Sequence, residues 1–76
     1  MSLKEKRKEA GYTQNTLSEI TGISLRTIQH FERNYRLTDN AKLETLCKLS
    51  IALNCQIDDL IVNDELRNMY RKAKTL

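Results

Sequence analysis

Hydrophobic side chains recur every three or four positions along most of this 76-residue chain, with polar side chains between them. That spacing is typical of α-helices that bury one face. The chain has no proline and only two glycines, and few of its residues favour strands. Leucine, lysine, glutamate and arginine are frequent, and all four favour helices. We therefore predict an all-α fold of five or six helices joined by short turns.

The first helix is expected over residues 2–10, because Leu3, Arg7 and Ala10 fall on one stripe at helical spacing. Gly11 is expected to end this helix in the left-handed conformation. Arg7 is a charged member of an otherwise apolar stripe, so it needs a partner of opposite charge.

The second helix carries two signals at its start. Thr13 is a good N-cap, and Tyr12 and Leu17 have the spacing of a hydrophobic staple, which fixes how the chain enters a helix. We expect Leu17 and Ile20 to face the core and Gly22 to end the helix.

The same signals recur at the third helix, where Ser24 is the N-cap and Ile23 and Ile28 have the staple spacing. Only residues 21–23 separate the two helices, and one of them is glycine. A connection this short forces a sharp corner between the helices. The pattern therefore predicts a helix-turn-helix.

One charged side chain of the third helix lies close to the buried side. Ile28 and Phe31 define that side, and Glu32 falls near its edge. Glu32 can then meet Arg7 of the first helix. We predict an ion pair between them, the alternative being two unrelated surface charges.

A polar connection is expected over residues 34–40, and a fourth helix over residues 40–53. Ile51 falls outside the apolar stripe of that helix. The stripe that we expect to face the core consists of Leu43, Leu46, Cys47, Ser50 and Leu53. Residues 54–56 then turn the chain.

A short fifth helix is expected next, with Asp58 and Asp59 near its N-terminus, because acidic side chains suit that end of a helix. Its apolar residues are Ile57, Leu60 and Ile61. The predicted helix-turn-helix domain covers residues 1–62, and residues 63–76 form an amphipathic helical tail. One face of this tail carries Leu66, Met69, Tyr70 and Ala73. The tail can pack on its own domain, pack on a second copy, or fray.

The positive charge of the chain is concentrated near the predicted corner. The formal net charge is +3, and residues 1–36 carry seven lysines and arginines against four acidic residues, a net of +3. Residues 37–62 have a net charge of −2, and residues 63–76 of +2. An anionic partner would meet the N-terminal half first, although ordinary surface charge explains these numbers equally well.

Side chains that hold metals or carry out catalysis are few. Cys47 and Cys55 lie eight positions apart without a CxxC motif, and His30, the only histidine, is far from both in sequence. We see no paired carboxylates for a cleft and no phosphate-binding loop. We therefore expect no enzyme, no metal and no cofactor. No signal peptide and no apolar run of membrane length is visible, so we expect a cytoplasmic protein without a membrane partner.

The outward side of the third helix carries side chains that suit DNA. Arginine can donate two hydrogen bonds to guanine, glutamine can pair with adenine, and threonine can touch a thymine methyl group or a phosphate. Backbone N–H groups at the start of the second helix suit a phosphate. The candidate DNA-binding residues are Gln14, Asn15, Ser24, Leu25, Arg26, Thr27, Gln29, His30, Arg33, Tyr35 and Arg36. A solvated helix face is the alternative for these residues alone, but the two staples, the glycine corner and the basic charge together favour DNA.

The run LKEKRKEAGYTQNTLSEITGISLRTIQHFERN resembles the phage-repressor, or Xre-type, helix-turn-helix family, and KLETLCKLSIALNCQIDDL resembles its fourth and fifth helices. The resemblance covers about residues 3–61 and implies a five-helix repressor-like domain, here followed by a short C-terminal helix. It implies that Gln14 contacts DNA and that Arg7 pairs with Glu32. It also implies that the recognition positions are Leu25, Arg26, Thr27, Gln29 and His30. Where the family often has glycine this chain has Asn34, which tolerates a left-handed backbone nearly as well.

We therefore expect a sequence-specific transcriptional regulator, by default a repressor, that binds double-stranded DNA as a homodimer. Its third helix would read the major groove. The alternative is a protein-interaction module such as an antitoxin. In that case the tail and Ile51 would bind a toxin or a co-regulator.

Overall fold

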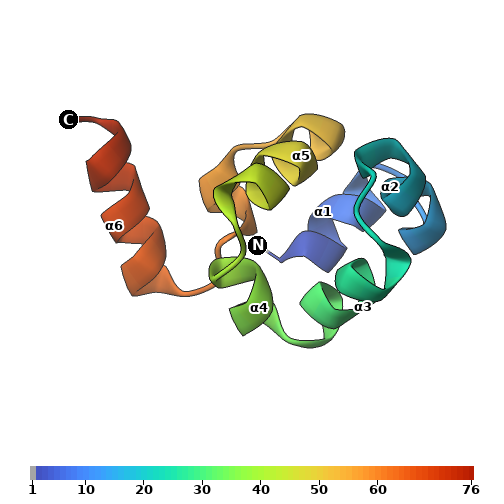
Figure 1. Ribbon diagram of the computed structural model, residues 1–76. Helices are drawn as coiled ribbons and strands as arrows, with labels where there is room; N and C mark the ends of the chain where they lie inside the picture. Colours follow the sequence, from blue (N-terminus) through green and yellow to red (C-terminus); the bar gives the residue numbers. More distant parts are fainter. Residues whose placement is uncertain (1) are drawn as a thin grey trace.

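Six α-helices and one short 3₁₀-helix follow one another along residues 2–76, the part of the chain described by this computed structural model (Figure 1). No strand occurs among these residues, so the predicted all-α fold class is confirmed. None of their helices has the length and apolar character needed to cross a membrane. The helices are α1 (Leu3–Glu9), α2 (Gln14–Thr21), α3 (Leu25–Arg33), α4 (Tyr35–Asp39), α5 (Leu43–Leu53), η1 (Ile57–Leu60) and α6 (Asp64–Lys74).

The helix boundaries of the N-terminal half follow the signals in the sequence. The side-chain oxygens of Thr13 and Ser24 cap α2 and α3 by accepting the N–H groups of Thr16 and Thr27, at 3.0 and 3.1 Å. The glycines that follow α1 and α2 both adopt the left-handed conformation, with φ of 78° and 74°. The predicted caps and the two glycine stops are therefore confirmed.

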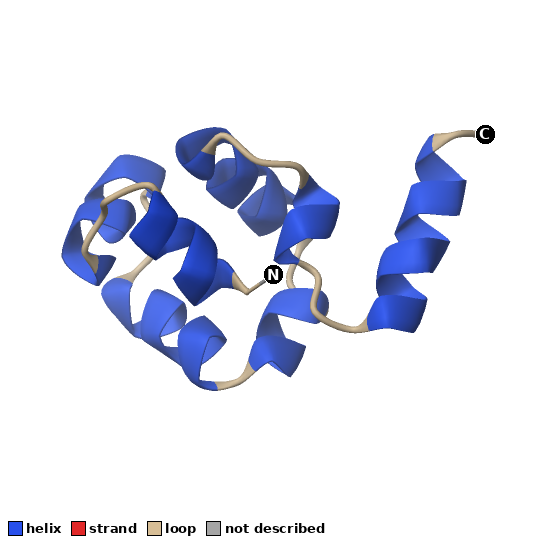
Figure 2. Ribbon diagram, turned by 180° about the vertical axis from the view of Figure 1, so that it is seen from behind, coloured by secondary structure: helices blue, strands red, loops and turns tan. Residues whose placement is uncertain are grey.

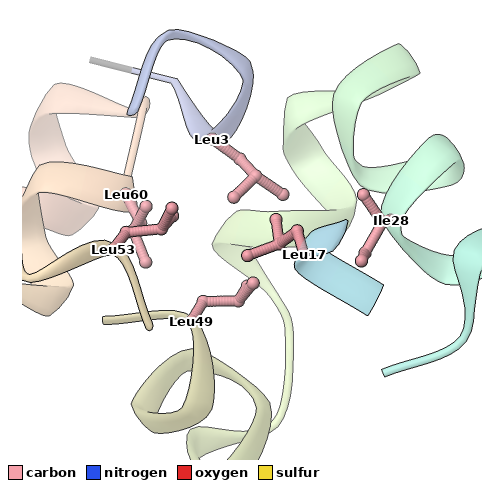
Figure 3. Close-up of a cluster of buried hydrophobic side chains, with 6 residues drawn as sticks. All are labelled: Leu3, Leu17, Ile28, Leu49, Leu53 and Leu60. Carbon is pink, nitrogen blue, oxygen red and sulfur yellow. The ribbon is translucent and has the colours of Figure 1, made fainter. Parts of the chain in front are cut away.

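The core lies where α1, α2, α3, α5 and η1 meet. Figure 3 shows its six side chains pointing toward one another: Leu3, Leu17, Ile28, Leu49, Leu53 and Leu60. Tyr12 and Ile23, the first members of the two staples, pack against this cluster. Burying a leucine or isoleucine fully contributes roughly 1.5–3 kcal/mol to folding. The staples thus fix α2 and α3 on a small core that few residues supply.

An ion pair joins α1 to α3. The Nε of Arg7 lies 2.7 Å from Oε2 of Glu32, and its Nη2 lies 3.0 Å from Oε1 of the same carboxylate. Both side chains are nearly buried, at 10% and 4% exposure. The predicted pair of Arg7 with Glu32 is confirmed, including its place at the edge of the core.

Two residues of the N-terminal half that we expected in the core lie at the surface. Ala10 is exposed because α1 ends at Glu9 and the chain turns away at the following glycine. Ile20 is 51% exposed because the groove between α2 and α5, which it lines together with Ile51, stays open to solvent. Ile51 is 80% exposed, as its position off the core stripe predicted.

The expected polar connection over residues 34–40 is wrong, since α4 occupies most of it. The side-chain oxygen of Asn34 accepts the N–H of Arg36 at 3.1 Å and so caps a five-residue helix. Asn34 has a φ of −139°, so this position uses an extended backbone rather than the expected left-handed one. Thr38, a residue of this helix, is buried, which a polar loop would not require.

The next helix starts later and faces the core differently from our expectation. Lys42 is extended, so α5 begins at residue 43 rather than 40. Leu43 is the first residue of α5 and is 66% exposed. The core side consists of Leu46, Leu49 and Leu53. Leu49 was missing from the predicted stripe, and Cys47 and Ser50 are only half-buried.

The expected fifth helix is a single turn of 3₁₀-helix, η1. The last helix, α6, lies beside η1 and stands apart from the other helices (Figures 1 and 2). Asp58 and Asp59 lie in the first turn of η1, as expected, and the buried carboxylate of Asp58 also pairs with the tail. This carboxylate lies 2.7 Å from Nε of Arg71 and 3.3 Å from Nζ of Lys74. Arg67 adds hydrogen bonds to the carbonyl oxygens of Ile61 and Val62. The tail therefore packs on its own domain through polar contacts, and no residue of α6 is buried.

Candidate nucleic-acid interface

The corner between α2 and α3 is held by side-chain hydrogen bonds as well as by the left-handed Gly22. The hydroxyl of Ser18 donates to the carbonyl oxygen of Ile23 at 2.6 Å. The hydroxyl of Thr21 donates to the carbonyl oxygen of Leu17 at 2.7 Å and accepts the N–H of Ile23 at 3.2 Å. These bonds tie the end of α2 to the start of α3. The outward side of α3 is therefore held in a fixed direction.

The candidate residues of α3 lie along the side that faces away from the core. Arg26, His30 and Arg33 are exposed. Leu25, Thr27 and Gln29 are half-buried beside them. Arg26 and Arg33 make no ion pair within residues 2–76. The structure thus brings six predicted residues together on one helix face and leaves its two guanidinium groups available.

Ser24 and Thr27 are already engaged with each other. Besides capping α3, the hydroxyl of Ser24 shares a hydrogen bond of 2.8 Å with the hydroxyl of Thr27. One of these hydroxyls must donate to the other, so only one donor remains for a ligand. The pair therefore fixes the first turn of α3, and its contribution to recognition is smaller than that of two free hydroxyls.

A polar cleft of about 520 Å³ lies beside this face, between α1, α2 and α3. One wall is ordered by Glu32, whose Oε1 accepts a hydrogen bond of 3.2 Å from the side-chain amide of Gln14. Hydrogen bonding to Glu32 raises the pKa of Arg7 above its ordinary value, so this guanidinium stays charged. The cleft is lined by Lys4, Arg7, Gln14, Gln29, Glu32 and Arg33.

Lys4 is a member of this cleft that our sequence analysis did not select. It lies three residues before Arg7, and residues three apart share one side of a helix. That spacing was the available signal. Lys4 makes no ion pair within the part of the chain that the structure describes. The cleft therefore holds two cations, Lys4 and Arg33, that make no ion pair within residues 2–76.

The remaining candidates lie outside the cleft. Asn15 is exposed in the first turn of α2. Tyr35 and Arg36 belong to α4 and line a second cleft, of about 350 Å³, together with Asp39, Asn40, Asn63 and Leu66. The structure therefore places Tyr35 and Arg36 in a different cleft from the one beside α3, near the start of α6.

Neither cysteine belongs to this region, and both are free thiols. Burial against the core, reinforced by the charge of Asp59, raises the pKa of Cys55, so its reactive thiolate form is disfavoured. No cluster of three or more histidine, cysteine, aspartate or glutamate side chains suited to a metal ion occurs among residues 2–76. The region can thus offer hydrogen-bond donors and positive charge to a ligand.

Comparison with known proteins gives two matches. The family model described as Helix-turn-helix (HTH_3) matches residues 3–60. The chain is also 41% identical, over 64 residues, to the HTH-type transcriptional regulator ImmR of Bacillus subtilis (strain 168). The aligned part covers 84% of this chain and 48% of that relative, so the chain spans about half the length of the curated protein. No solved structure matches the chain.

Proposed function

Because the chain belongs to the HTH_3 helix-turn-helix family, we propose that it is a sequence-specific DNA-binding transcriptional regulator whose α3 reads the major groove. The observation that carries the proposal is the outward side of α3. There Arg26 and Gln29 stand on a helix whose direction is fixed by the corner. Their side chains can bond to guanine and adenine edges. Thr27 and Leu25 can touch thymine methyl groups.

Phosphate contacts would flank this reading helix. Asn15 and the free N–H groups at the start of α2 can bind one phosphate, and the side chain of Gln14 lies beside them. Arg33 and Lys4, which line the cleft, can neutralise a neighbouring phosphate of the DNA backbone. His30 contributes either a base contact or a phosphate contact. Tyr35 and Arg36 would touch the backbone farther along, from α4.

We propose further that the protein acts as a homodimer and represses transcription. One small domain offers few contacts, whereas two copies place two reading helices about 34 Å apart, one turn of DNA. Such an arrangement would recognise an inverted repeat. Repression by blocking polymerase is the simplest outcome of occupying such a site, and the proposed action is binding without a chemical step.

Selection of binding sites from a random duplex DNA library tests the proposal. The selection should be done at about 150 mM salt, where non-specific phosphate attraction is partly screened. We expect an enriched motif with two inverted halves. Enrichment of a single half-site would contradict the dimer. No enrichment, from a protein shown to be folded, would overturn specific DNA reading.

A protein-interaction module, such as an antitoxin, is the second candidate function. The observation that favours it is the open groove of about 170 Å³ between α2 and α5, where Ile20 and Ile51 are exposed. Exposed apolar side chains that lie together in one groove can mark a protein-binding surface. Binding of a toxin or a co-regulator that Ile51→Glu abolishes, with DNA binding unchanged, would support this function.

A further inference from the structure

The outer side of α6 differs in its contacts from the side that meets the domain. Arg67, Arg71 and Lys74 hold the inner side to Ile61, Val62 and Asp58. The opposite side lines a shallow pocket of about 250 Å³ formed by Glu65, Asn68, Met69 and Lys72. These four residues have the spacing of a single helix face. We call them the outer stripe.

The two charged residues of the outer stripe lack partners, unlike the charges around them. Asp64 pairs with Arg67, and Arg71 and Lys74 both pair with Asp58. Glu65 and Lys72 make no ion pair within residues 2–76. They lie at opposite ends of the stripe, and Met69, which is 60% exposed, lies between them. The stripe thus has an acidic end, an exposed apolar centre and a basic end.

We propose that the outer stripe binds the outer stripe of a second copy of this chain, with the two α6 helices antiparallel. A two-fold axis between Asn68 and Met69 would set Glu65 of each copy opposite Lys72 of the other, because both lie equally far from that axis. Met69 of the two copies would meet at the centre. The surface is self-complementary, as a two-fold interface requires. A parallel pair would set like charges against each other, so the charges select the antiparallel orientation.

The position of α6 in the fold allows this contact. In Figures 1 and 2 it stands to one side of the other helices, at the opposite end of the molecule from α2. An 11-residue helix is about 16 Å long, so the pair buries less than the roughly 1,200 Å² of a stable interface. The dimer is therefore weak in free solution. Two copies held on one DNA would form it much more readily.

The proposal extends the dimeric form proposed above, but it does not depend on DNA contact, and its test uses protein without DNA. Sedimentation equilibrium of the full chain, up to millimolar concentration, measures self-association. In the proposed pair, residue 65 of each copy faces residue 72 of the other. Each of the single substitutions Glu65→Lys and Lys72→Glu therefore sets two like charges opposite each other at both of these contacts. We expect each to weaken self-association about tenfold or more. Glu19→Lys makes the same charge change as Glu65→Lys at an exposed residue of α2, and it should leave self-association unchanged.

The double variant, Glu65→Lys with Lys72→Glu, separates the proposal from simple damage to α6. It restores opposite charges across an antiparallel pair, so self-association should return to near the level of the unaltered chain. If the substitutions acted only by disturbing the folding of α6, the double variant would self-associate the least of the three variants. A chain that stays monomeric at millimolar concentration would overturn the proposal. Self-association that ignores both single substitutions would overturn it too.

Discussion

Glu32 of α3 accepts two hydrogen bonds from Arg7 of α1, at 2.7 and 3.0 Å, although the two residues lie 25 positions apart in the chain. The third arm of the guanidinium donates to the carbonyl oxygen of Tyr12 at 2.8 Å, so Arg7 also holds the turn before α2. Gln14 joins the same carboxylate from α2. One ion pair thus connects the three helices that form the proposed DNA-binding surface.

Replacing Glu32 by glutamine should destabilise the protein strongly. The substitution leaves the guanidinium of Arg7 buried without a counter-charge, which costs about 3–5 kcal/mol in comparable pairs. That is a large part of the total stability of about 5–15 kcal/mol of a small domain. Urea unfolding followed by circular dichroism measures the loss. Glu19→Gln is the matched control, because Glu19 is exposed on α2 and makes no ion pair within residues 2–76.

The double substitution Arg7→Met with Glu32→Leu should recover much of the lost stability, because it removes both charges instead of stranding one. A Glu32→Gln variant that is as stable as the control would show that the pair contributes little. Recovery of stability without recovery of DNA binding would place the role of the pair in orienting Gln14 and the cleft.

The parts of the fold that could be predicted from sequence depend on signals between near neighbours. A cap and a staple involve residues within about five positions of one another, as at Thr13 and Leu17, so their meaning does not depend on the rest of the chain. The partner of Arg7 could be found because a charge on an apolar stripe requires a counter-charge. Glu32 was the acidic residue nearest the buried side of α3.

The parts that could not be predicted depend on how helices pack. Leu49, rather than Cys47 or Ser50, faces the core because of the rotation of α5 about its axis, and several apolar faces of that helix fit its sequence equally well. The five residues of α4 are too few to show a helical period. Asp58 meets Arg71 only because α6 folds back beside η1, and no local pattern encodes that contact.

Arg26→Ala should reduce specific DNA binding by about 1–3 kcal/mol and leave the fold intact, because Arg26 is exposed and has no partner within the chain described. The measurement is fluorescence anisotropy with the duplex enriched by selection and with a scrambled duplex. Arg26→Lys is the informative control, since it keeps the charge but loses the two-pronged hydrogen bond. If lysine restores full specificity, Arg26 contacts a phosphate and not a base.

Lys4→Gln should weaken binding to the selected and the scrambled duplex equally. A phosphate contact carries no sequence information, and its loss reduces the slope of log affinity against log salt by about one. The matched control is Lys8→Gln, an equal charge change at an exposed residue of α1 that does not line the cleft. Equal slopes for the two variants would mean that Lys4 acts only through net charge, and that the cleft between α1 and α3 does not hold a phosphate.

The attachment of α6 should depend on pH through Asp58. Hydrogen bonding to Arg71 is the main reason that the pKa of this carboxyl lies below its ordinary value, and Lys74 adds to the effect while burial opposes it. A carboxyl whose pKa is lower in the folded than in the unfolded state stabilises the folded state when it is ionised. This contribution is fully present above the pKa of the unfolded state, about 4, and is lost as the pH falls through the lower pKa of the folded state. Because Arg71 and Lys74 are about half exposed, the expected contribution is only about 1 kcal/mol.

Hydrogen-exchange protection factors of residues 64–74 measure that attachment. Asp58→Asn should lower them about fivefold at pH 7, the change that 1 kcal/mol produces, while protection in α1 to α3 stays the same. In the unaltered chain the same loss should develop below about pH 4, and the variant should show no further loss there. Equal protection of α6 in the two proteins at pH 7 would mean that the hydrogen bonds of Arg67 to residues 61–62 hold the helix without Asp58.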